Sequence, residues 1–174
     1  MGATDKIAVI AERKVTYNGI YDMKETYSYI KNFLSDSKNY DFAEKDYEEK
    51  NDGANRKVDV KCEAELQYND YYKIILKFNL LMDGKQVSID TPEGMTLKRV
   101  KGSAKLTINC YIQPDWQNKR QKGPLATFLD QLHAHYLKGQ QEQEKCIIHA
   151  ATDVSELIAR FKQQMNALKK KKKR

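Results

Sequence analysis

The sequence predicts an α+β fold, in which a mostly antiparallel sheet of six to seven strands is packed on one face by an early helix and by long C-terminal helices (a helix-grip-like arrangement). Apolar residues alternate with polar ones through much of the first two thirds of the chain, which is the period of a half-buried strand. Around Tyr27 and in the last third they recur every three or four residues, which indicates amphipathic helices. A chain of 174 residues suits one core, so residues 1–168 are expected to form a single domain.

The central strands show the clearest pattern. Apolar residues occupy every second position from Arg56 to Tyr68, and the same alternation resumes from Tyr72 to Met82. Asn69-Asp70 separates the two runs, and the short polar side chains of such a pair stabilise tight turns. These two segments are therefore predicted to form an antiparallel hairpin.

Glycines are expected to divide the following segment into further strands. Asp83-Gly84 is typical of a two-residue hairpin turn, Pro92 to Gly94 interrupts the alternation, and Gly102 precedes another alternating run. An N-terminal strand over Ile7 to Tyr17 and a charged edge strand over Tyr40 to Glu49 complete the predicted sheet.

Two parts of the chain are predicted to be helical. Asp22, followed three residues later by Glu25, resembles a capping box at the start of a short helix. In the last third, Pro124 is expected to open one helix, and Asp153 with Glu156 is expected to open a second. Each start precedes apolar residues at helical spacing, so these helices would cover the apolar face of the sheet.

The order of these elements from Lys6 to Leu168 resembles the helix-grip (START-like) layout, in which a curved antiparallel sheet wraps a long terminal helix. That resemblance implies a gap between sheet and helix that can hold an apolar ligand. The turn Tyr17-Asn18-Gly19-Ile20-Tyr21-Asp22 and the segment Glu44-Lys45-Asp46-Tyr47 are also similar to those of small uncharacterised archaeal α+β proteins. This second resemblance implies no activity.

The net charge of +7 comes almost entirely from the C-terminus. The last six residues are all basic, which leaves 25 basic against 24 acidic residues in the remainder. Such a tail, expected to be disordered, binds RNA or DNA through counterion release, although an anionic membrane surface or a mere solubility or cloning tail are alternatives. The tail consists of Lys169, Lys170, Lys171, Lys172, Lys173 and Arg174.

Two further basic segments are candidates for phosphate contacts within the folded domain. The alternative interpretation is that they are ordinary solvated strand ends and loops, because exposed lysines are common without a ligand. The first segment contains Lys98, Arg99, Lys101 and Lys105, and the second contains Lys119, Arg120 and Lys122.

No motif identifies a catalytic, cofactor or metal site. The chain lacks a P-loop, a dinucleotide fingerprint and a nucleophile elbow, so no catalytic residue and no cofactor are assigned. Cys62 and Cys110 fall on apolar strand faces, where thiols serve as inert packing. The remaining metal-ligand types are too widely spaced for a typical zinc site, so helical surface or interface positions are the preferred interpretation. These residues are His133, His135, Cys146 and His149.

The leading hypothesis is a non-enzymatic cytoplasmic binding or accessory protein, tethered to nucleic acid or a ribonucleoprotein by the lysine tail. An odd number of cysteines and the lack of an apolar leader favour a reducing, intracellular compartment. No apolar stretch approaches the ~20 residues of a membrane-spanning helix. An assembly or scaffold component of undetermined oligomeric state is one alternative.

Another alternative is a START-like carrier of a hydrophobic small molecule, with a cavity between the sheet and the terminal helix. A cavity of ~300 Å³ or more would favour that function, whereas a filled interior would count against it. The expected lining residues are Leu76, Phe78, Leu106, Ile108, Leu157, Ile158 and Phe161.

Overall fold

A computed structural model describes residues 6–117, Leu125, Phe128, Leu132 and 137–170. The α+β class is confirmed: five antiparallel strands and two helices account for most of this part of the chain. The elements are β1 (Ile7–Tyr21), α1 (Met23–Asn32), the π-helical turn η1 (Phe33–Ser37), β2 (Asp41–Asp52), β3 (Asn55–Gln67), β4 (Tyr72–Asp90), β5 (Thr96–Pro114) and α3 (Leu137–Lys170).

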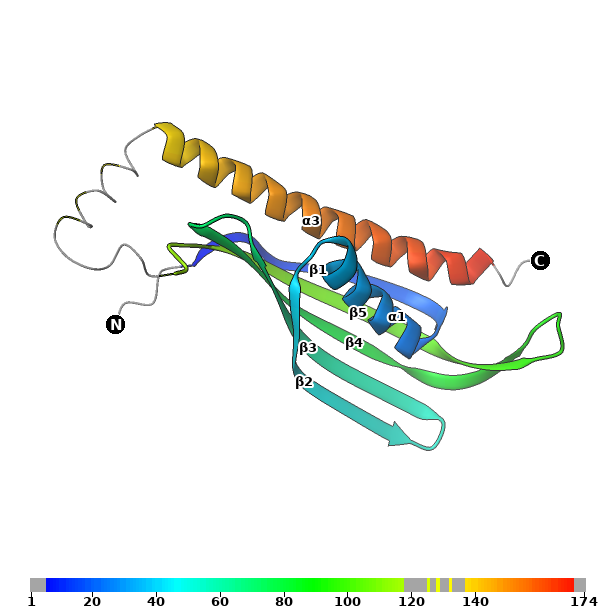
Figure 1. The fold of residues 1–174 in the computed structure, drawn as a ribbon. Coiled ribbons are helices and arrows are strands. Elements are labelled where there is room, and N and C mark those ends of the chain that lie inside the picture. The colour runs from blue at the N-terminus through cyan, green and yellow to red at the C-terminus, as the bar shows by residue number, and fades with distance from the viewer. Residues whose placement is uncertain (1–5, 118–124, 126–127, 129–131, 133–136, 171–174) are drawn as a thin grey trace.

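The sheet has the strand order β1-β5-β4-β3-β2, so the N-terminal strand pairs with the last one. Figure 1 shows the sheet as a curved layer, with α3 and α1 on the same side of it. β2 is the outer strand at one edge, and its side chains are exposed at all but one position. The prediction of a charged edge strand is therefore confirmed.

The predicted strand number of six to seven is wrong, because two glycines that were expected to end strands lie inside long ones. β4 continues through Gly84 to Asp90, and β5 continues through Gly102. Gly19, Gly102 and Gly84 pair side by side across β1, β5 and β4, and we call them the glycine row. A Cβ atom on Gly84 would lie 2.5 Å from the carbonyl oxygen of Lys101. Glycine therefore permits the close approach of strands that a sharply bent sheet requires.

The two turns that join the central strands lie where the sequence predicts them. The Asn69 side-chain oxygen accepts hydrogen bonds from the backbone N–H groups of Tyr71 at 2.9 Å and Tyr72 at 2.6 Å. The β4–β5 turn contains Gly94, whose φ of +82° favours glycine. Asn69 and Gly94 thus provide the local chemistry of these hairpins.

Asp22 caps α1 as predicted, because its Oδ1 accepts a hydrogen bond from the Glu25 N–H at 2.8 Å. The predicted helix start at Asp153 is wrong, because α3 runs without a break through this position. Asp153 is 2% exposed and accepts hydrogen bonds from the Tyr40 hydroxyl at 2.8 Å and from Lys38 Nζ at 3.1 Å. It anchors α3 to the segment after η1 instead of capping a helix.

The C-terminal third has one long described helix rather than several. Most of the segment expected to form the first C-terminal helix, from Pro124 onwards, lies outside the described residues, and Leu125, Phe128 and Leu132 are helical and exposed. α3 extends through Lys170, and therefore two residues into the tail that was expected to be disordered. Among the described helices, none has the length and apolar content needed to cross a bilayer.

Candidate ligand-binding site

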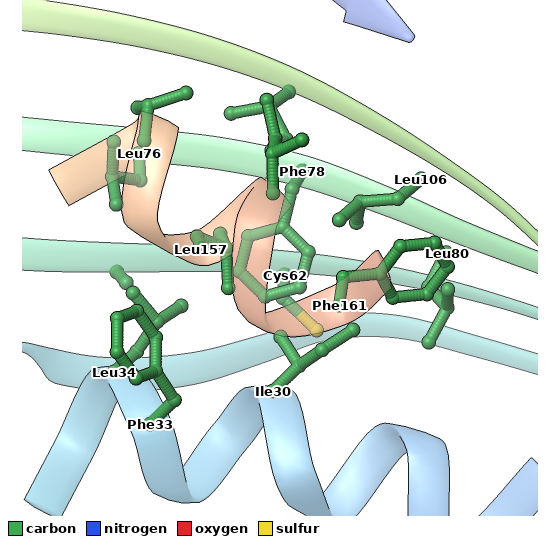
Figure 2. Close-up of a cluster of buried hydrophobic side chains, with 14 of the residues drawn as sticks. Ile30, Phe33, Leu34, Cys62, Leu76, Phe78, Leu80, Leu106, Leu157 and Phe161 are labelled. Carbon is green, nitrogen blue, oxygen red and sulfur yellow. The ribbon is translucent and has the colours of Figure 1, made fainter. Parts of the chain in front are cut away.

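The seven residues expected to line a cavity instead belong to the hydrophobic core. Their exposed fractions range from 0% to 5%. Figure 2 shows Leu157 and Phe161 of α3 together with side chains of the sheet and with Ile30 of α1. The space between α3 and the sheet is therefore occupied by side chains. The seven are Leu76, Phe78, Leu106, Ile108, Leu157, Ile158 and Phe161.

A pocket of about 490 Å³ lies elsewhere, between the N-terminal half of α1 and strands β2 to β5. Its apolar floor comes from three neighbouring strands, and every floor residue is at most 4% exposed. Met23 and Tyr27 of α1 contribute to the wall, whereas α3 contributes no described residue. The floor consists of Val58, Val60, Met82 and Val100.

The strand pattern explains the apolar floor. Val58 pairs with Met82, and both belong to alternating positions whose side chains share one face of the sheet. On the same face, Ala104 of β5 pairs with Met82 and Leu106 pairs with Leu80, and both β5 residues are completely buried in the core beside the pocket. The pocket is therefore the part of the apolar sheet face that α3 leaves uncovered.

The rim of the pocket is rich in cations. The lining includes Lys24, Arg56, Lys98 and Arg99, but only one carboxylate, that of Asp22. Within the described chain, Lys24 and Lys98 have no ion-pair partner, and both are exposed. These two unpaired lysines give the rim an excess of positive charge.

Each rim arginine is partly engaged by a carboxylate. Arg99 Nη1 lies 2.7 Å from Asp22 Oδ2, because β1 ends opposite Val100 and places Asp22 beside Arg99. Arg56 Nη2 lies 2.6 Å from Glu49 Oε1, and this hydrogen bond lowers the pKa of Glu49. Both guanidinium groups therefore have fixed positions at the rim.

Two tyrosines of the lining are neutral hydrogen-bonding groups. Tyr27 donates to Glu44 Oε2 at 2.6 Å, and Tyr47 donates to Glu49 Oε2 at 3.0 Å. Burial, assisted by these carboxylates, raises the pKa of both phenols. Apolar surface, neutral phenols and cations together are chemically suited to binding an amphipathic molecule.

The structure separates the first predicted basic segment into two groups. Lys98 and Arg99 lie at the pocket rim, but Lys101 and Lys105 do not line it. Lys101 and Lys105 occupy the positions of β5 that alternate with buried Ala104, and therefore belong to the face that α3 does not cover. Arg99 follows the same alternation, but it lies just beyond the end of β1, where its Nη1 reaches Asp22 Oδ2 at 2.7 Å.

That outer face has mixed charge in the described residues, because its lysines lie close to carboxylates. Such a surface gives no broad positive area for a nucleic acid backbone. Three of its ion pairs are Lys61–Asp46 at 3.5 Å, Lys77–Glu63 at 3.6 Å and Lys73–Glu65 at 2.9 Å.

The other predicted basic residues are described only in part. Lys169 and Lys170 are the last residues of α3. Those outside the described residues are Lys119, Arg120, Lys122, Lys171, Lys172, Lys173 and Arg174.

The histidine and cysteine set does not form a metal site in the described part of the chain. His133 and His135 lie outside it, and Cys146 is completely buried in the core. His149 Nε2 lies 3.3 Å from Asp153 Oδ2. Among the described residues, no three histidine, cysteine or acidic side chains cluster as metal ligands would.

Sequence reasoning identified Lys98 and Arg99 but not the rest of the pocket. Lys24, Tyr47 and Arg56 were not singled out, because nothing in a single sequence shows that α1, β2 and β3 converge here. The alternation around Val58 indicated a buried strand face, which is the one signal that pointed to the floor. No family model, curated protein or solved structure matches the chain, so the site is defined by its geometry.

Proposed function

We propose that the protein is a non-enzymatic carrier that binds a small molecule with an apolar part in the pocket beside α1. The main supporting observation is a pocket of about 490 Å³ with a floor of four buried apolar side chains. This volume is typical of small-molecule sites, and covering the floor with a ligand would remove apolar surface from water.

The position of the pocket differs from the gap implied by the START-like resemblance. Side chains occupy the space beneath α3, whereas the pocket lies beside α1. The three described cysteines are free and buried, which supports a reducing, cytoplasmic environment for the carrier.

A matched pair of substitutions tests this function. Val58→Phe places a larger side chain in the pocket, whereas Val154→Phe makes the same change in the packed core. With Nile red as a neutral fluorescent probe, the unmodified protein should show saturable binding, and Val58→Phe should weaken it by at least about tenfold. Val154→Phe should retain the affinity of the remaining folded protein but lower the free energy of unfolding by about 1–3 kcal/mol.

Chemical denaturation of both variants gives the fraction of each that is folded under the binding conditions, so that the affinities of the folded proteins can be compared. Absence of saturable binding to the unmodified chain, or unchanged affinity in folded Val58→Phe, would contradict the proposed function.

A second role is tethering to RNA or DNA by the C-terminal tail. This proposal is based on six adjacent cations on a chain whose other charges almost cancel. Deleting residues 169–174 should abolish most salt-dependent binding to single-stranded RNA, measured by fluorescence anisotropy between 50 and 200 mM salt. Full retention of affinity would exclude the tail, and binding only to anionic vesicles would identify a membrane surface as its target.

A further inference from the structure

We infer that the ligand of this pocket has an anionic head group, a carboxylate or a phosphate monoester, which Lys98 and Arg99 bind at the rim while its apolar part covers the floor. This inference depends on the proposed function and adds the chemical class of the ligand.

The first argument is the local imbalance of charge. Four basic side chains and one carboxylate line the pocket. By contrast, the chain without its last six residues has 25 basic and 24 acidic residues. Glu44 and Glu49 adjoin the lining tyrosines, but Lys24 and Lys98 have no ion-pair partner among the described residues, so the rim keeps an excess of positive charge. A negatively charged head group gains from this field, whereas a positively charged one is repelled.

The second argument is the direction in which the pocket changes from polar to apolar. β3 and β5 are both antiparallel to β4 and therefore run in the same direction. On β3, Arg56 precedes Val58 by two residues, and on β5, Lys98 precedes Val100 by two residues. Because side chains two residues apart share a face, each cation is separated from an apolar floor residue by roughly 7 Å. Along β4, Lys98 pairs with Ser88 and Arg56 pairs with Gly84, so Met82 of the floor lies on the inner side of both cations. A molecule with its head at Lys98 and its apolar part towards Met82 matches this order.

The third argument is that Arg99 already binds a carboxylate and has further N–H donors that are unused. Arg99 Nη1 donates to Asp22 Oδ2 at 2.7 Å, and the same nitrogen lies 3.3 Å from the backbone oxygen of Lys98. In the described chain, its Nε and Nη2 groups have no hydrogen-bond partner. A guanidinium has five N–H donors in one plane, so a second carboxylate or a phosphate can bind beside Asp22.

The partial burial of Arg99 strengthens such a contact. Its side chain is 21% exposed, whereas Lys98 beside it is exposed. An ionic hydrogen bond is stronger where less water competes for the donor. Arg99 would therefore fix the orientation of the head group, and Lys98 would add charge attraction from the solvent side.

Four amphiphiles with the same ten-carbon chain test the inference by isothermal titration calorimetry: decanol, decanoate, decyl phosphate and decyltrimethylammonium. At least one of the two anions should bind about tenfold or more tightly than decanol, and the cation should bind most weakly. The anion with the higher affinity identifies the head group as a carboxylate or a phosphate. The preference for the anion should decrease as salt is added.

Lys98→Gln is the main test variant, because Lys98 is exposed and has no ion-pair partner among the described residues, so the fold should remain intact. It should reduce the anion-to-decanol affinity ratio several-fold. Arg99→Gln should reduce the ratio further, but it also removes a contact to the residue that caps α1. Lys105→Gln is the matched control, because Lys105 lies on the opposite face of the same strand and its loss should leave the ratio unchanged.

The possible failures are distinguishable. Equal affinity for decanol and both anions, or an unchanged ratio in Lys98→Gln, would overturn the anionic head group while leaving the carrier function in place. Failure of all four amphiphiles to bind would overturn the carrier function and this inference together.

Discussion

The two halves of the helix-facing side of the sheet differ in how they are covered. In one half, Leu157 and Phe161 of α3 pack against the sheet, and the core side chains are nearly inaccessible to solvent. In the other half, Val58, Met82 and Val100 are also at most 4% exposed, but they form the floor of a pocket of about 490 Å³. The apolar alternation of the strands continues through both halves. The pattern therefore determines which face is apolar, whereas the overlying helix determines whether that face is sealed or open.

The glycine row crosses the sheet within the floor of the pocket. On β5, Gly102 separates core residue Ala104 from pocket residue Val100, and Gly84 is its neighbour on β4. Because these strands approach closely where Cβ atoms are lacking, the sheet can bend here. Val58 and Met82 lie on the same side of the row as Ala104, which pairs with Met82, whereas Val100 lies beyond it, so the pocket floor extends across the row.

The largest expected difference between the halves is in how much the truncation of a buried methionine lowers the free energy of unfolding. Met165 of α3 is completely buried in the core, and Met82 is 1% exposed but lines the pocket. Met165→Ala should lower the free energy of unfolding by about 2–5 kcal/mol, because it leaves a cavity in packed surroundings. Met82→Ala should cost less, because it only enlarges an existing space. Urea denaturation measures both, and equal losses would mean that the halves are packed alike.

Removing the polar contact that anchors α3 should cause the second-largest loss in the free energy of unfolding. Asp153→Asn removes the carboxylate that accepts hydrogen bonds from Lys38 and Tyr40. Loss of hydrogen bonds to a buried charged group should lower the free energy of unfolding by about 1.5–3 kcal/mol. Glu156→Gln is the control, because Glu156 pairs with the same lysine but is exposed. A loss of stability in Glu156→Gln as large as that in Asp153→Asn would show that burial is not the cause.

The glycine row provides a test of the pocket floor itself. An added Cβ atom at Gly102 would overlap the carbonyl oxygen of Asp83, so Gly102→Ala should lower the free energy of unfolding by about 1–3 kcal/mol. It should also weaken binding of the Nile red probe, because the pocket strands shift. Gly94→Ala is the matched control in the β4–β5 turn, where an added Cβ meets no atom within 4 Å. Its positive φ makes it mildly destabilising, but probe binding should not change.

The smallest expected effect is an alkaline loss of stability in the filled half. Burial raises the pKa of Cys110 to about 12 and that of Cys146 to about 11, from an ordinary value of 9.0. Because the folded-state pKa is the higher one, this stabilisation is fully present below pH 9. It is lost as the pH rises towards 11–12, since the unfolded chain releases these protons first.

Urea denaturation at pH 8, 9.5 and 10.5 should therefore show falling stability. Cys146→Ala should make the decline less steep, whatever its effect at pH 8. Identical slopes with and without Cys146 would show that its thiol is not protected by folding. Ellman's reagent should also react far more slowly with the native thiols than with the urea-unfolded chain.

The predictable parts of the fold are those governed by near neighbours in the chain. Alternation placed β3 and the first part of β4, Asn69 marked their turn, and Asp22 marked the start of α1. The wrong predictions concern residues whose local sequence is compatible with two different structures. Gly84 is compatible with a turn and with a bend inside a strand, and only the neighbouring backbone distinguishes them.

Asp153 shows the same limit for a polar side chain. Beside Glu156 it resembles a helix cap, but its hydrogen-bond partner Tyr40 is 113 residues away in the sequence. The rim of the pocket is similar, since Arg99 contacts Asp22 across 77 residues. No local period or spacing encodes such pairs.

The sequence by itself determined that apolar side chains occupy one face of the strands and one stripe of each helix, because side-chain direction follows directly from backbone geometry. It also determined the turn at Asn69 and the capping of α1 by Asp22, since both use contacts within three residues. The tertiary structure alone decided that α3 fills one half of the sheet and leaves a cation-rimmed pocket in the other. That outcome depends on the bend at the glycine row and on how far each helix reaches, which only the packing of distant segments determines.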